Sequence, residues 1–357
     1  MPTIRDVARA SRVSIATVSR VFNDSPLVTE HTRRRVLASA SRLGYWPNSI
    51  ARSLITNRTH TLGVVMPDLF GEFFSEVVHG MDLAARERGY HLLVSRSSSN
   101  PGDLAETLRT MRGRVDGLAL MAPDFDASRF LHEGPAAVPT VLLNPESAPL
   151  EADSVSIANF EGASEVVRHL IALGHRRIAH IGGPPGNIDA RQRRDGYRDA
   201  LRQAGIVHEA ELELPGDFAE GSGFRAAAEL LRRAERPTAI FAANDYMAVG
   251  ALGALHDAGV RVPEEMALVG FDDIALARSV TPPLTTVHVD MMELGRRAVV
   301  LLLERGERPG APDGRHEVLA TTLIVRGSCG AGAPIAGGPR FAGGGPHGAS
   351  PPRRHSA

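Results

Sequence analysis

Cysteine is nearly absent from this sequence, and its scarcity excludes several kinds of site. Cys329 stands alone among 357 residues, so it can form no internal disulfide and has no companions for a cysteine-based metal site. A single unpaired thiol is typical of a protein kept in a reducing compartment. We therefore expect a cytoplasmic protein in which Cys329 is inert, with neither a metal nor a cofactor.

Lysine is missing altogether, because all 40 basic residues are arginine. This absence excludes lysine chemistry such as Schiff-base catalysis. The sequence also lacks a P-loop pattern, a nucleophile elbow and a zinc-ligand spacing. Together these absences predict that the protein is not an enzyme.

Long apolar runs are missing as well. No run approaches the roughly 20 residues that a helix needs to cross a bilayer, and no basic leader with an apolar core opens the chain. We therefore expect no membrane contact. With 43% hydrophobic and 23% charged residues, the chain can still bury a large core, and its length suits two or three globular units.

The net charge of −1 conceals a difference between two parts of the chain. Residues 1–60 carry ten arginines and three acidic residues, a net charge of +7, and the remainder has a net charge of −8. A small basic module on an acidic body is typical of a phosphate-backbone binder joined to a sensor or an enzyme. An ordinary solvated surface is the alternative.

The basic segment predicts three short helices. Thr3 can cap the first helix, with Asp6 returning the capping bond, and Ser14 can cap a second helix over residues 15–23. Two short helices joined by so tight a turn form a helix-turn-helix, whose second helix enters the major groove of DNA. A third helix is expected over residues 30–43, stopped by a glycine.

Four runs of residues stand in order along this segment. They are 3–8 (Thr-Ile-Arg-Asp-Val-Ala), 13–23 (Val-Ser-Ile-Ala-Thr-Val-Ser-Arg-Val-Phe-Asn), 43–48 (Leu-Gly-Tyr-Trp-Pro-Asn) and 51–54 (Ala-Arg-Ser-Leu). Together they closely resemble the lactose/galactose repressor (LacI/GalR) family of bacterial transcriptional regulators, and the resemblance extends from residue 2 to about residue 328. It implies a sequence-specific DNA-binding regulator, most often a repressor of carbohydrate-utilisation genes, controlled by a small sugar-like effector.

The resemblance also implies which side chains contact DNA. The base-contacting positions fall on Ile15, Ala16 and Arg20. Arg20 can bind guanine O6 and N7 with two hydrogen bonds, whereas Ile15 and Ala16 offer apolar contact, for example to thymine methyls. The positions implied to contact phosphates are Ser19, Asn23, Thr29, Thr32, Tyr45 and Asn48. Ser19 can equally be a spectator.

Residues 47–60 are expected to form a hinge helix and linker between the head, residues 1–46, and the body. The stretch 47–54 makes barely two helical turns, and an isolated helix below roughly 12 residues is marginal in water. The resemblance implies that two such helices lie in the minor groove and that Leu54 wedges into a base step and kinks the DNA. A flexible linker with Leu54 packed on the body is the alternative.

The body, residues 61–326, alternates short apolar runs with amphipathic stretches. The apolar runs are 62–66, 91–94, 117–121, 140–143, 178–181, 239–242 and 267–270. This alternation indicates parallel sheets with crossover helices, and so many units predict two lobes. The resemblance implies an all-α helix-turn-helix domain followed by a two-lobed α/β sensor domain of the type I periplasmic-binding-protein fold. Its N-lobe would comprise about 61–159 and 290–320, and its C-lobe about 160–288 and 321–326.

Polar residues follow several of the apolar runs, where ligands of open α/β sheets bind. Carboxylate, guanidinium and amide groups beside aromatic rings suit a polyhydroxylated ring. The resemblance implies that Arg193, Asn244 and Asp272 hold ligand hydroxyls. The remaining candidates for effector binding, at positions that vary with the ligand or beside them, are Phe73, Phe74, Asn187, Asp189 and Phe218.

Structural roles are the alternative at several of these positions. For Asp272, Asn244 and Asn187 the alternative is a helix cap or an ion pair between lobes. Asp245 is expected to cap the helix that begins at Tyr246 rather than to bind the effector.

Two observations leave other functions open. Many relatives have Asp-Asn where this chain has Ala158-Asn159, so a frequent ligand contact is missing and a purine or nucleoside effector is an alternative. A sugar-binding protein of solute transport shares the body fold, although it would require an export signal where this chain has a DNA-binding helix. His175, the one tempting general base, matches a structural histidine in the family.

The hinge suggests a mechanism in which two subunits pair through their bodies and effector closure of the lobes shifts a marginal helix between ordered and disordered states. The sequence does not indicate whether the effector releases DNA or promotes its binding. Residues 327–357, with nine glycines and five prolines, are expected to form a disordered tail. The tail lacks the leucine heptads of tetrameric relatives, so we predict a homodimer on pseudo-palindromic operator DNA.

Overall fold

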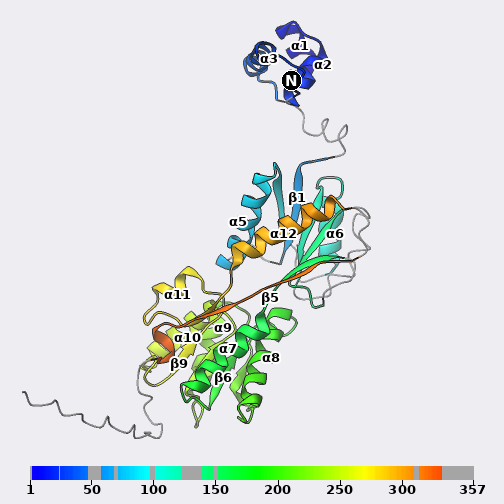
Figure 1. Ribbon diagram of the computed structural model, residues 1–357. Coiled ribbons are helices and arrows are strands. Elements are labelled where there is room, and N and C mark those ends of the chain that lie inside the picture. Colours follow the sequence, from blue (N-terminus) through cyan, green and yellow to red (C-terminus); the bar gives the residue numbers. More distant parts are fainter. Residues whose placement is uncertain are drawn as a thin grey trace, which may run out of the picture.

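The computed structural model describes residues 2–23, 25–46, 58–67, 71–96, 101–122, 138–147, 152–308 and 313–331. Within these residues the chain forms an all-α head and two α/β lobes, each with its own parallel sheet (Figure 1). This is the fold class that the sequence predicts. The predicted DNA contacts Asn48 and Leu54, the stretch 47–54 predicted to form the hinge helix and residues 332–357 of the predicted tail lie outside the described residues.

Three capped helices make up the head. They are α1 (Ile4–Ser11), α2 (Ile15–Phe22) and α3 (Glu30–Leu43). At the start of α1 the Asp6 carboxylate accepts hydrogen bonds from the backbone and the hydroxyl of Thr3, at 2.9 and 2.7 Å. At the start of α2 the Ser14 hydroxyl accepts from the Thr17 N–H at 3.1 Å. α3 ends at Gly44, whose φ of +62° is the left-handed conformation that favours glycine. The predicted caps are confirmed.

A small apolar core joins these helices. It consists of Val7, Ala8, Val18, Val21, Val36 and Ala40. Arg33 of α3 links this helix to the end of α2 and the segment after it. Its two terminal nitrogens donate to the carbonyl oxygens of Val21 at 3.2 Å and Ser25 at 3.1 Å. Such a core is small, so the head serves chiefly to present the outer side of α2.

The first lobe is built on a six-stranded sheet in the order β11-β5-β4-β3-β1-β2, with all neighbours parallel. Its strands are β1 (Thr61–Met66), β2 (His91–Arg96), β3 (Gly117–Met121), β4 (Thr140–Leu143), β5 (Asp153–Ile157) and β11 (His316–Leu319). Its helices are α5 (Glu72–Glu87), α6 (Pro101–Met111) and α12 (Met291–Gly306). Successive side chains of a strand point to opposite faces, so Val64 packs with α5 and α12, whereas Val65 packs with α6.

The second lobe is built on a four-stranded parallel sheet in the order β7-β6-β8-β9. Its strands are β6 (Ile178–Ile181), β7 (Glu213–Leu214), β8 (Ala239–Ala242) and β9 (Ala267–Val269). Its helices are α7 (Asn159–Ala172), α8 (Ile188–Gln203), α9 (Glu220–Leu231), α10 (Asp245–Asp257) and α11 (Ala275–Ser279). Ile240 faces α9 and α10, and Phe241 faces α7 and α8. The apolar runs coincide with the strands, and the predicted parallel sheets are confirmed.

The chain passes three times between the lobes. β5 leads to α7 through Ala158, β10 leads to α12 through residues 289–290, and β11 leads to β12 through residues 320–321. β10 (Thr286–His288) and β12 (Thr322–Ile324) pair antiparallel as a separate two-stranded sheet. The Ala158 N–H donates to the Leu319 carbonyl at 3.0 Å, which joins the first and third crossings.

Residues 327–329 correct the predicted start of the tail. They form a short 3-10 helix, η3 (Gly327–Cys329), in which Ser328 and Cys329 are buried. The Ser328 hydroxyl donates to the Leu268 carbonyl at 2.6 Å and accepts from the Thr285 N–H at 2.8 Å. The expectation of disorder from residue 327 was therefore wrong. Glycine content is a local property of the sequence, and it does not show that the Ser328 hydroxyl bonds to residues 43 and 60 positions away.

The helices in the described part of the chain are not suited to a bilayer. None of them is long and apolar enough to cross a membrane.

Candidate functional site

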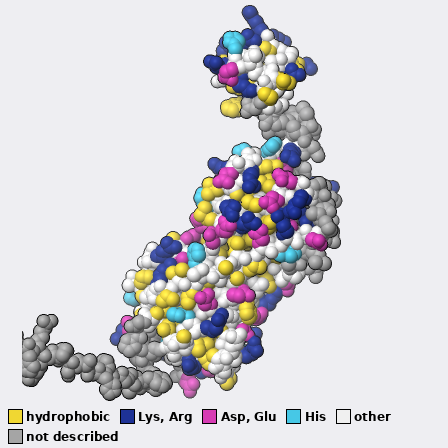
Figure 2. All heavy atoms as spheres, in the orientation of Figure 1, with side chains coloured by type: hydrophobic (Ala, Val, Ile, Leu, Met, Phe, Trp, Pro, Cys, Tyr) yellow, Lys and Arg dark blue, Asp and Glu magenta, His cyan; other side chains and the backbone are white. Residues whose placement is uncertain are grey.

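The second helix of the head presents the predicted base contacts at its surface. Ile15, Ala16 and Arg20 are exposed, and Ile15 keeps 46% of its surface accessible, whereas Val18 and Val21 are buried. The periodicity of α2 thus separates a side that faces the core from a side that is free to enter a groove. Figure 2 shows arginine side chains gathered over the head, which provides the positive potential that attracts a phosphate backbone.

Five of the six predicted phosphate contacts lie in the described part of the head. Ser19 and Thr32 are in α2 and α3, Asn23 and Thr29 cap these helices, and Tyr45 follows the end of α3. Thr29 caps α3, where its hydroxyl accepts from the Thr32 N–H at 3.4 Å and donates to the Thr32 hydroxyl at 3.1 Å. The Asn23 amide donates to the Ser19 hydroxyl at 3.4 Å. Burial raises the pKa of Tyr45, so its hydroxyl stays a neutral hydrogen-bond donor. The contacts of these residues with DNA stay predictions.

A buried arginine organises a polar cluster at the carboxyl ends of the second lobe's strands. Arg193, on α8, is 3% exposed. Its Nε donates to Asn159 Oδ1 at 2.8 Å, and its Nη1 donates to the Ala243 carbonyl at 2.6 Å. The guanidinium carbon lies 3.8 Å from the centre of the Phe271 ring, and Nη1 lies 3.1 Å from Asp272 Oδ1. The start of α7 and the segments after β8 and β9 therefore meet at one guanidinium.

Asp189 extends this cluster to the first lobe. Its Oδ1 accepts from the Asn159 amide at 2.8 Å, and its Oδ2 accepts from the Asn144 amide at 3.3 Å. Asn144 directly follows β4, and its own Oδ1 accepts from the Ile157 N–H at 3.0 Å. One carboxylate of the second lobe is thus held by the strand end of the first. The structure brings Asp189, Arg193 and Asp272 together, as a shared binding site requires.

Asp272 carries a buried carboxylate oxygen that forms an ion pair but no well-aligned hydrogen bond. Its Oδ1 accepts no hydrogen bond from the described residues, although Arg193 Nη1 lies 3.1 Å away. Burial raises the pKa of Asp272 to about 6, and the Arg193 guanidinium opposes that rise. A hydroxyl group of a bound ligand would supply a better-aligned donor to this oxygen.

Two of the predicted effector residues act as helix caps. Asn187 Oδ1 accepts from the Ala190 N–H at 3.1 Å at the start of α8. Asn244 Oδ1 accepts from the Met247 N–H at 2.9 Å at the start of α10, and its amide donates to the Phe218 carbonyl at 3.0 Å. The capping alternative accounts for these side-chain oxygens, and ligand contact by Asn187 and Asn244 stays a prediction.

The expectation that Asp245 caps this helix was wrong. Asn244 is the cap, and Asp245 is the first residue of α10, fully buried. The Asp245 carboxylate accepts from the Thr286 hydroxyl at 2.6 Å and from the Ile274 N–H at 3.0 Å. Burial and the charge of the neighbouring aspartates raise its pKa well above the ordinary value. A Cβ placed on Gly270 would lie 2.1 Å from its Oδ1, so the carboxylate packs directly against the loop after β9.

The predicted aromatic contacts come from both lobes. Phe218 is half-buried with a φ of +67°, and a Cβ placed on Gly183 would lie 2.5 Å from its ring. Phe73 and Phe74 lie in the first turn of α5, where their ring centres are 5.3 Å apart in an edge-to-face arrangement. Ligand contact by these three rings stays a prediction.

A polar contact that sequence reasoning missed joins the lobes beside α5. The Glu72 N–H donates to the Tyr246 hydroxyl at 3.2 Å, and Glu72 Oε1 accepts from the Ala275 N–H at 2.6 Å. Glu72 begins a helix of the first lobe, whereas Tyr246 and Ala275 lie at the starts of helices of the second. The contact therefore stabilises the present arrangement of the two lobes.

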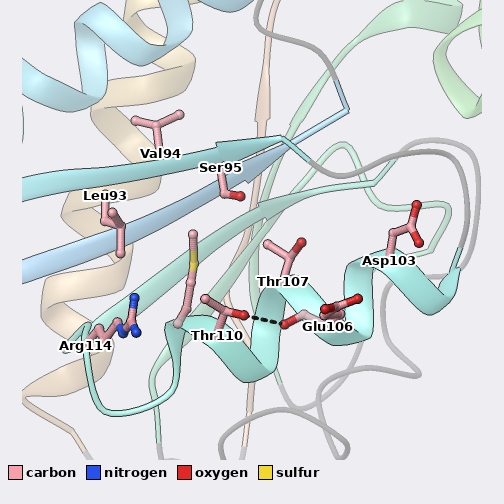
Figure 3. A pocket seen from close by; sticks show the side chains of 9 residues that line it. Leu93, Val94, Ser95, Asp103, Glu106, Thr107, Thr110 and Arg114 are labelled. Carbon is pink, nitrogen blue, oxygen red and sulfur yellow. Dashed lines mark hydrogen bonds between the residues drawn. The ribbon is translucent and has the colours of Figure 1, made fainter.

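A hollow of about 370 Å³ lies elsewhere, between the outer strand β2 and α6 (Figure 3). It is lined by Leu93, Val94, Ser95, Asp103, Glu106, Thr107, Thr110, Met111 and Arg114. The Thr110 hydroxyl donates to the Glu106 carbonyl at 3.0 Å. None of the predicted effector residues lines this hollow, so we do not assign the effector to it.

Asn144 and Asn159 are members of the polar cluster that sequence reasoning did not select. Asn144 directly follows the apolar run 140–143, so inspecting that strand end like the others would have found it. Asn159 is notable in the sequence only because it follows Ala158, where many relatives have an aspartate that contacts the ligand. Its bonds to Asp189 and Arg193 depend on how α7 and α8 pack, which no local pattern shows.

Comparisons with known proteins match both parts of the chain. Residues 3–48 match the family model for bacterial regulatory proteins of the lacI family, and residues 167–329 match the periplasmic binding protein-like domain. The ribose operon repressor of Escherichia coli (strain K12) is 39% identical over 332 residues, which cover 92% of this chain and 100% of that protein. The chain belongs to the LacI family of bacterial regulatory proteins.

Solved structures of LacI-family members share the fold. The lac repressor dimer bound to operator and the anti-inducer ONPF has a TM-score of 0.84 at 31% identity, over 92% of this chain and 99% of that one. A LacI family regulator from Enterococcus faecium with bound ribose has a TM-score of 0.68 at 28% identity, over 77% of this chain and 100% of that one.

Membership in the LacI family decides the general function. The protein is a DNA-binding transcriptional regulator that responds to a small-molecule effector, and its family consists of such regulators rather than enzymes. The match over the helix-turn-helix argues against the alternative of a transport protein that binds sugar without binding DNA.

Proposed function

We propose that this LacI-family regulator represses carbohydrate-utilisation genes and that its effector is a sugar, with D-ribose the first candidate. The observation that carries the proposal is the buried Asp272 Oδ1, which forms an ion pair with Arg193 but accepts no well-aligned hydrogen bond from the described residues. One sugar hydroxyl would donate to this oxygen, and a second would accept from the guanidinium. Phe218 would offer an apolar surface to the ring. Similarity to the ribose operon repressor and to a ribose-bound regulator supports ribose among the sugars.

We propose the same effector set that the sequence predicts, with two additions. Asn144 and Asn159 hold Asp189 and Arg193 in place. Because Asn144 belongs to the first lobe and Asp189 to the second, a ligand bound here touches both and favours their closure. Closure then shifts the hinge helices, which biases an equilibrium between DNA-bound and free protein.

We propose that the head binds operator DNA through the exposed side of α2. Arg20 reads a guanine, and Ile15 and Ala16 make apolar contacts in the major groove. Phosphate contacts come from Ser19, Asn23, Thr29, Thr32, Tyr45 and Asn48, and Leu54 enters the minor groove. A homodimer acting in the cytoplasm, without catalytic activity, completes the proposal. The division into residues 1–46, 47–60 and 61–326 stays a prediction.

Calorimetric titration with D-ribose tests the effector site. Asp272→Asn removes the charge but keeps the shape, so we expect D-ribose affinity to fall by roughly ten- to a hundredfold, because a hydrogen bond to a charged group contributes about 1.5–3 kcal/mol. Asp257→Asn, an identical change at an exposed position of the same lobe, is the matched control and should leave the affinity unchanged. Binding of a nucleoside but not of D-ribose would contradict the sugar assignment.

Selection of operators from random duplexes tests the DNA contacts. Arg20→Ala should relax the preference for one G·C pair in each half-site by about 1–3 kcal/mol. Arg42→Ala, at an exposed position in the last turn of α3, should weaken binding to all duplexes alike. Absence of any preferred palindrome, with and without D-ribose, would refute the regulatory function.

A further inference from the structure

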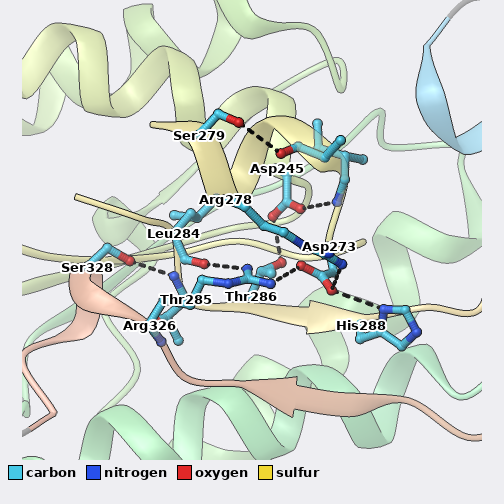
Figure 4. A network of polar contacts seen from close by, with 12 residues as sticks. Asp245, Asp273, Arg278, Ser279, Leu284, Thr285, Thr286, His288, Arg326 and Ser328 are labelled. Atoms are coloured by element: carbon cyan, nitrogen blue, oxygen red, sulfur yellow. Dashed lines mark hydrogen bonds and ion pairs between the residues drawn. The ribbon is translucent and has the colours of Figure 1, made fainter. Parts of the chain in front are cut away.

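Asp273 gathers side chains from three separate segments of the chain (Figure 4). Its carboxylate is 3% exposed and pairs with Arg326 Nη2, with His288 Nδ1 at 3.1 Å and with Arg278 Nη2 at 3.4 Å. Arg326 follows β12, His288 ends β10, and Arg278 lies in α11. Arg326 is the most deeply placed of the three, with 15% of its side chain exposed, whereas Arg278 is 64% exposed.

The loop that carries Asp273 has an unfavourable backbone conformation. Asp272 and Asp273 have φ angles of +110° and +59°, which residues with a Cβ rarely adopt. Such a conformation persists only where surrounding contacts hold it. The Asp272 N–H donates to the Val287 carbonyl at 2.8 Å, and the Ile274 N–H donates to Asp245 Oδ2 at 3.0 Å. Asp273 stands between these two hydrogen-bonded residues, and its side chain adds the contacts with Arg326, Arg278 and His288.

Arg326, the partner of Asp273, is itself held in place by hydrogen bonds to a neighbouring segment. Its Nη1 donates to the Leu284 carbonyl at 2.8 Å, and its backbone N–H donates to the Thr285 hydroxyl at 2.8 Å. β12 enters the second lobe from the third crossing, and His288 directly precedes the second. The ion pair of Asp273 with Arg326 and its hydrogen bond with His288 therefore connect the loop of Asp272 and Asp273 to two of the three segments that link the lobes.

We propose that Asp273 is a positioning residue for the effector response. It holds Asp272 in its ligand-binding geometry through Arg326, and it couples that loop to the segments that move when the lobes close. This inference rests on the proposed function of Asp272 as an effector contact. Asp273 itself does not touch the ligand. Loss of its carboxylate should therefore impair effector binding through Asp272 and leave operator binding intact.

The test compares D-ribose affinity by calorimetry with operator affinity by fluorescence anisotropy. Asp273→Asn and Arg326→Gln should each weaken D-ribose binding roughly tenfold or more, because each breaks a buried charged hydrogen bond. Operator affinity without D-ribose should stay within about twofold. The matched control is Arg278→Gln, which removes the longest and most exposed of the three contacts and should change neither affinity by more than about twofold.

A double-substitution cycle separates positioning from a general structural role. In an Asp272→Asn background, Asp273→Asn should add less than about twofold, because its effect passes through Asp272. An undiminished tenfold loss in that background overturns the proposal. So does an equal loss of operator affinity.

Hydrogen exchange without any ligand keeps the inference testable if D-ribose is the wrong effector. Unaltered D-ribose binding in Asp272→Asn would refute the proposed function itself. The backbone N–H of Asp272 should then still exchange faster in Asp273→Asn and Arg326→Gln than in Arg278→Gln. Equal exchange in all three variants overturns the positioning role.

Discussion

His180 and Asp272 are buried titratable side chains of the second lobe whose pKa values depart in opposite directions from their ordinary ranges. Burial lowers the pKa of His180 to about 4, because its ring is stacked between Tyr197 and Phe241 at centroid distances of 5.1 and 4.9 Å. Burial raises the pKa of Asp272 to about 6. In both cases the protein disfavours the charged form of the side chain.

The stability of the fold should depend on pH through His180. Between pH 6.5 and 4 the unfolded chain binds a proton at this residue that the folded chain does not, so the free energy of unfolding falls as pH falls. We expect a loss of about 2 kcal/mol between pH 7 and pH 5 from this group. Urea titrations of wild type and His180→Phe at both pH values isolate the contribution of His180 to the free energy of unfolding, since the other titrating groups are common to the two proteins. Equal losses in the two proteins would show that His180 is not responsible.

Effector binding should depend on pH through Asp272. If the ligand donates a hydroxyl to the ionised carboxylate, protons compete with the ligand below the pKa of about 6. D-ribose affinity should therefore fall about tenfold between pH 7 and pH 5. The residual affinity of Asp272→Asn should be flat over this range. A flat profile in the wild type would contradict the proposed contact.

At the scale of helices, both lobes use glycine to bring helices into backbone contact. A Cβ placed on Gly80 of α5 would lie 2.1 Å from the Met292 carbonyl oxygen, and one on Gly295 of α12 would lie 2.0 Å from the Val77 carbonyl oxygen. The second lobe repeats the arrangement between α9 and α10, where a Cβ on Gly250 would lie 1.9 Å from the Glu220 carbonyl oxygen. These contacts involve backbone, so the neighbour cannot move aside as a side chain could.

Gly295→Ala should therefore destabilise the first lobe. We expect the free energy of unfolding to fall by about 3 kcal/mol, because a methyl group forced between two helix backbones separates them. Gly253→Ala, within α10, is the matched control: its added Cβ would meet Phe224 at an ordinary 3.6 Å, so the better helix propensity of alanine should stabilise by up to about 1 kcal/mol. Urea titration measures both. A neutral Gly295→Ala would show that α5 and α12 can repack.

At the scale of the whole molecule, one core cluster runs from the first lobe into the second. It includes Val64 of β1 and Leu294 of α12 as well as Ile178 of β6, together with Val287 and Val289 next to the second crossing. The lobes are thus joined by apolar packing as well as by the polar cluster around Arg193. Contacts at the edge of the interface, such as that of Glu72, can then adjust the closure of the lobes without determining the fold.

Glu72→Ala tests this adjustment. It removes the acceptor of the Ala275 N–H and should make the present lobe arrangement less favourable by about 1 kcal/mol, which corresponds to roughly fivefold weaker D-ribose binding. Glu76→Ala, one turn further along α5, is the control and should bind as the wild type does. Calorimetry provides both affinities. Tighter binding by Glu72→Ala would mean that the effector selects a different arrangement of the lobes.

The sequence by itself determined the local features of this protein: the capped helices of the head, the strands with their carboxyl ends, and the motifs of the LacI family. It also indicated Asp189, Arg193 and Asp272 as polar residues at those ends. Such features depend on neighbours within a few positions, because caps and periodicity act over one or two turns.

Only the tertiary structure decided which of these residues meet. Asn144 reaches Asp189 across 45 positions of sequence, Asp273 pairs with Arg326 across 53, and Ser328 is buried against β9 although its neighbours in sequence are typical of a tail. The physical reason is that such contacts form where separate elements pack. Their partners are then set by the path of the chain between the two lobes rather than by any local pattern.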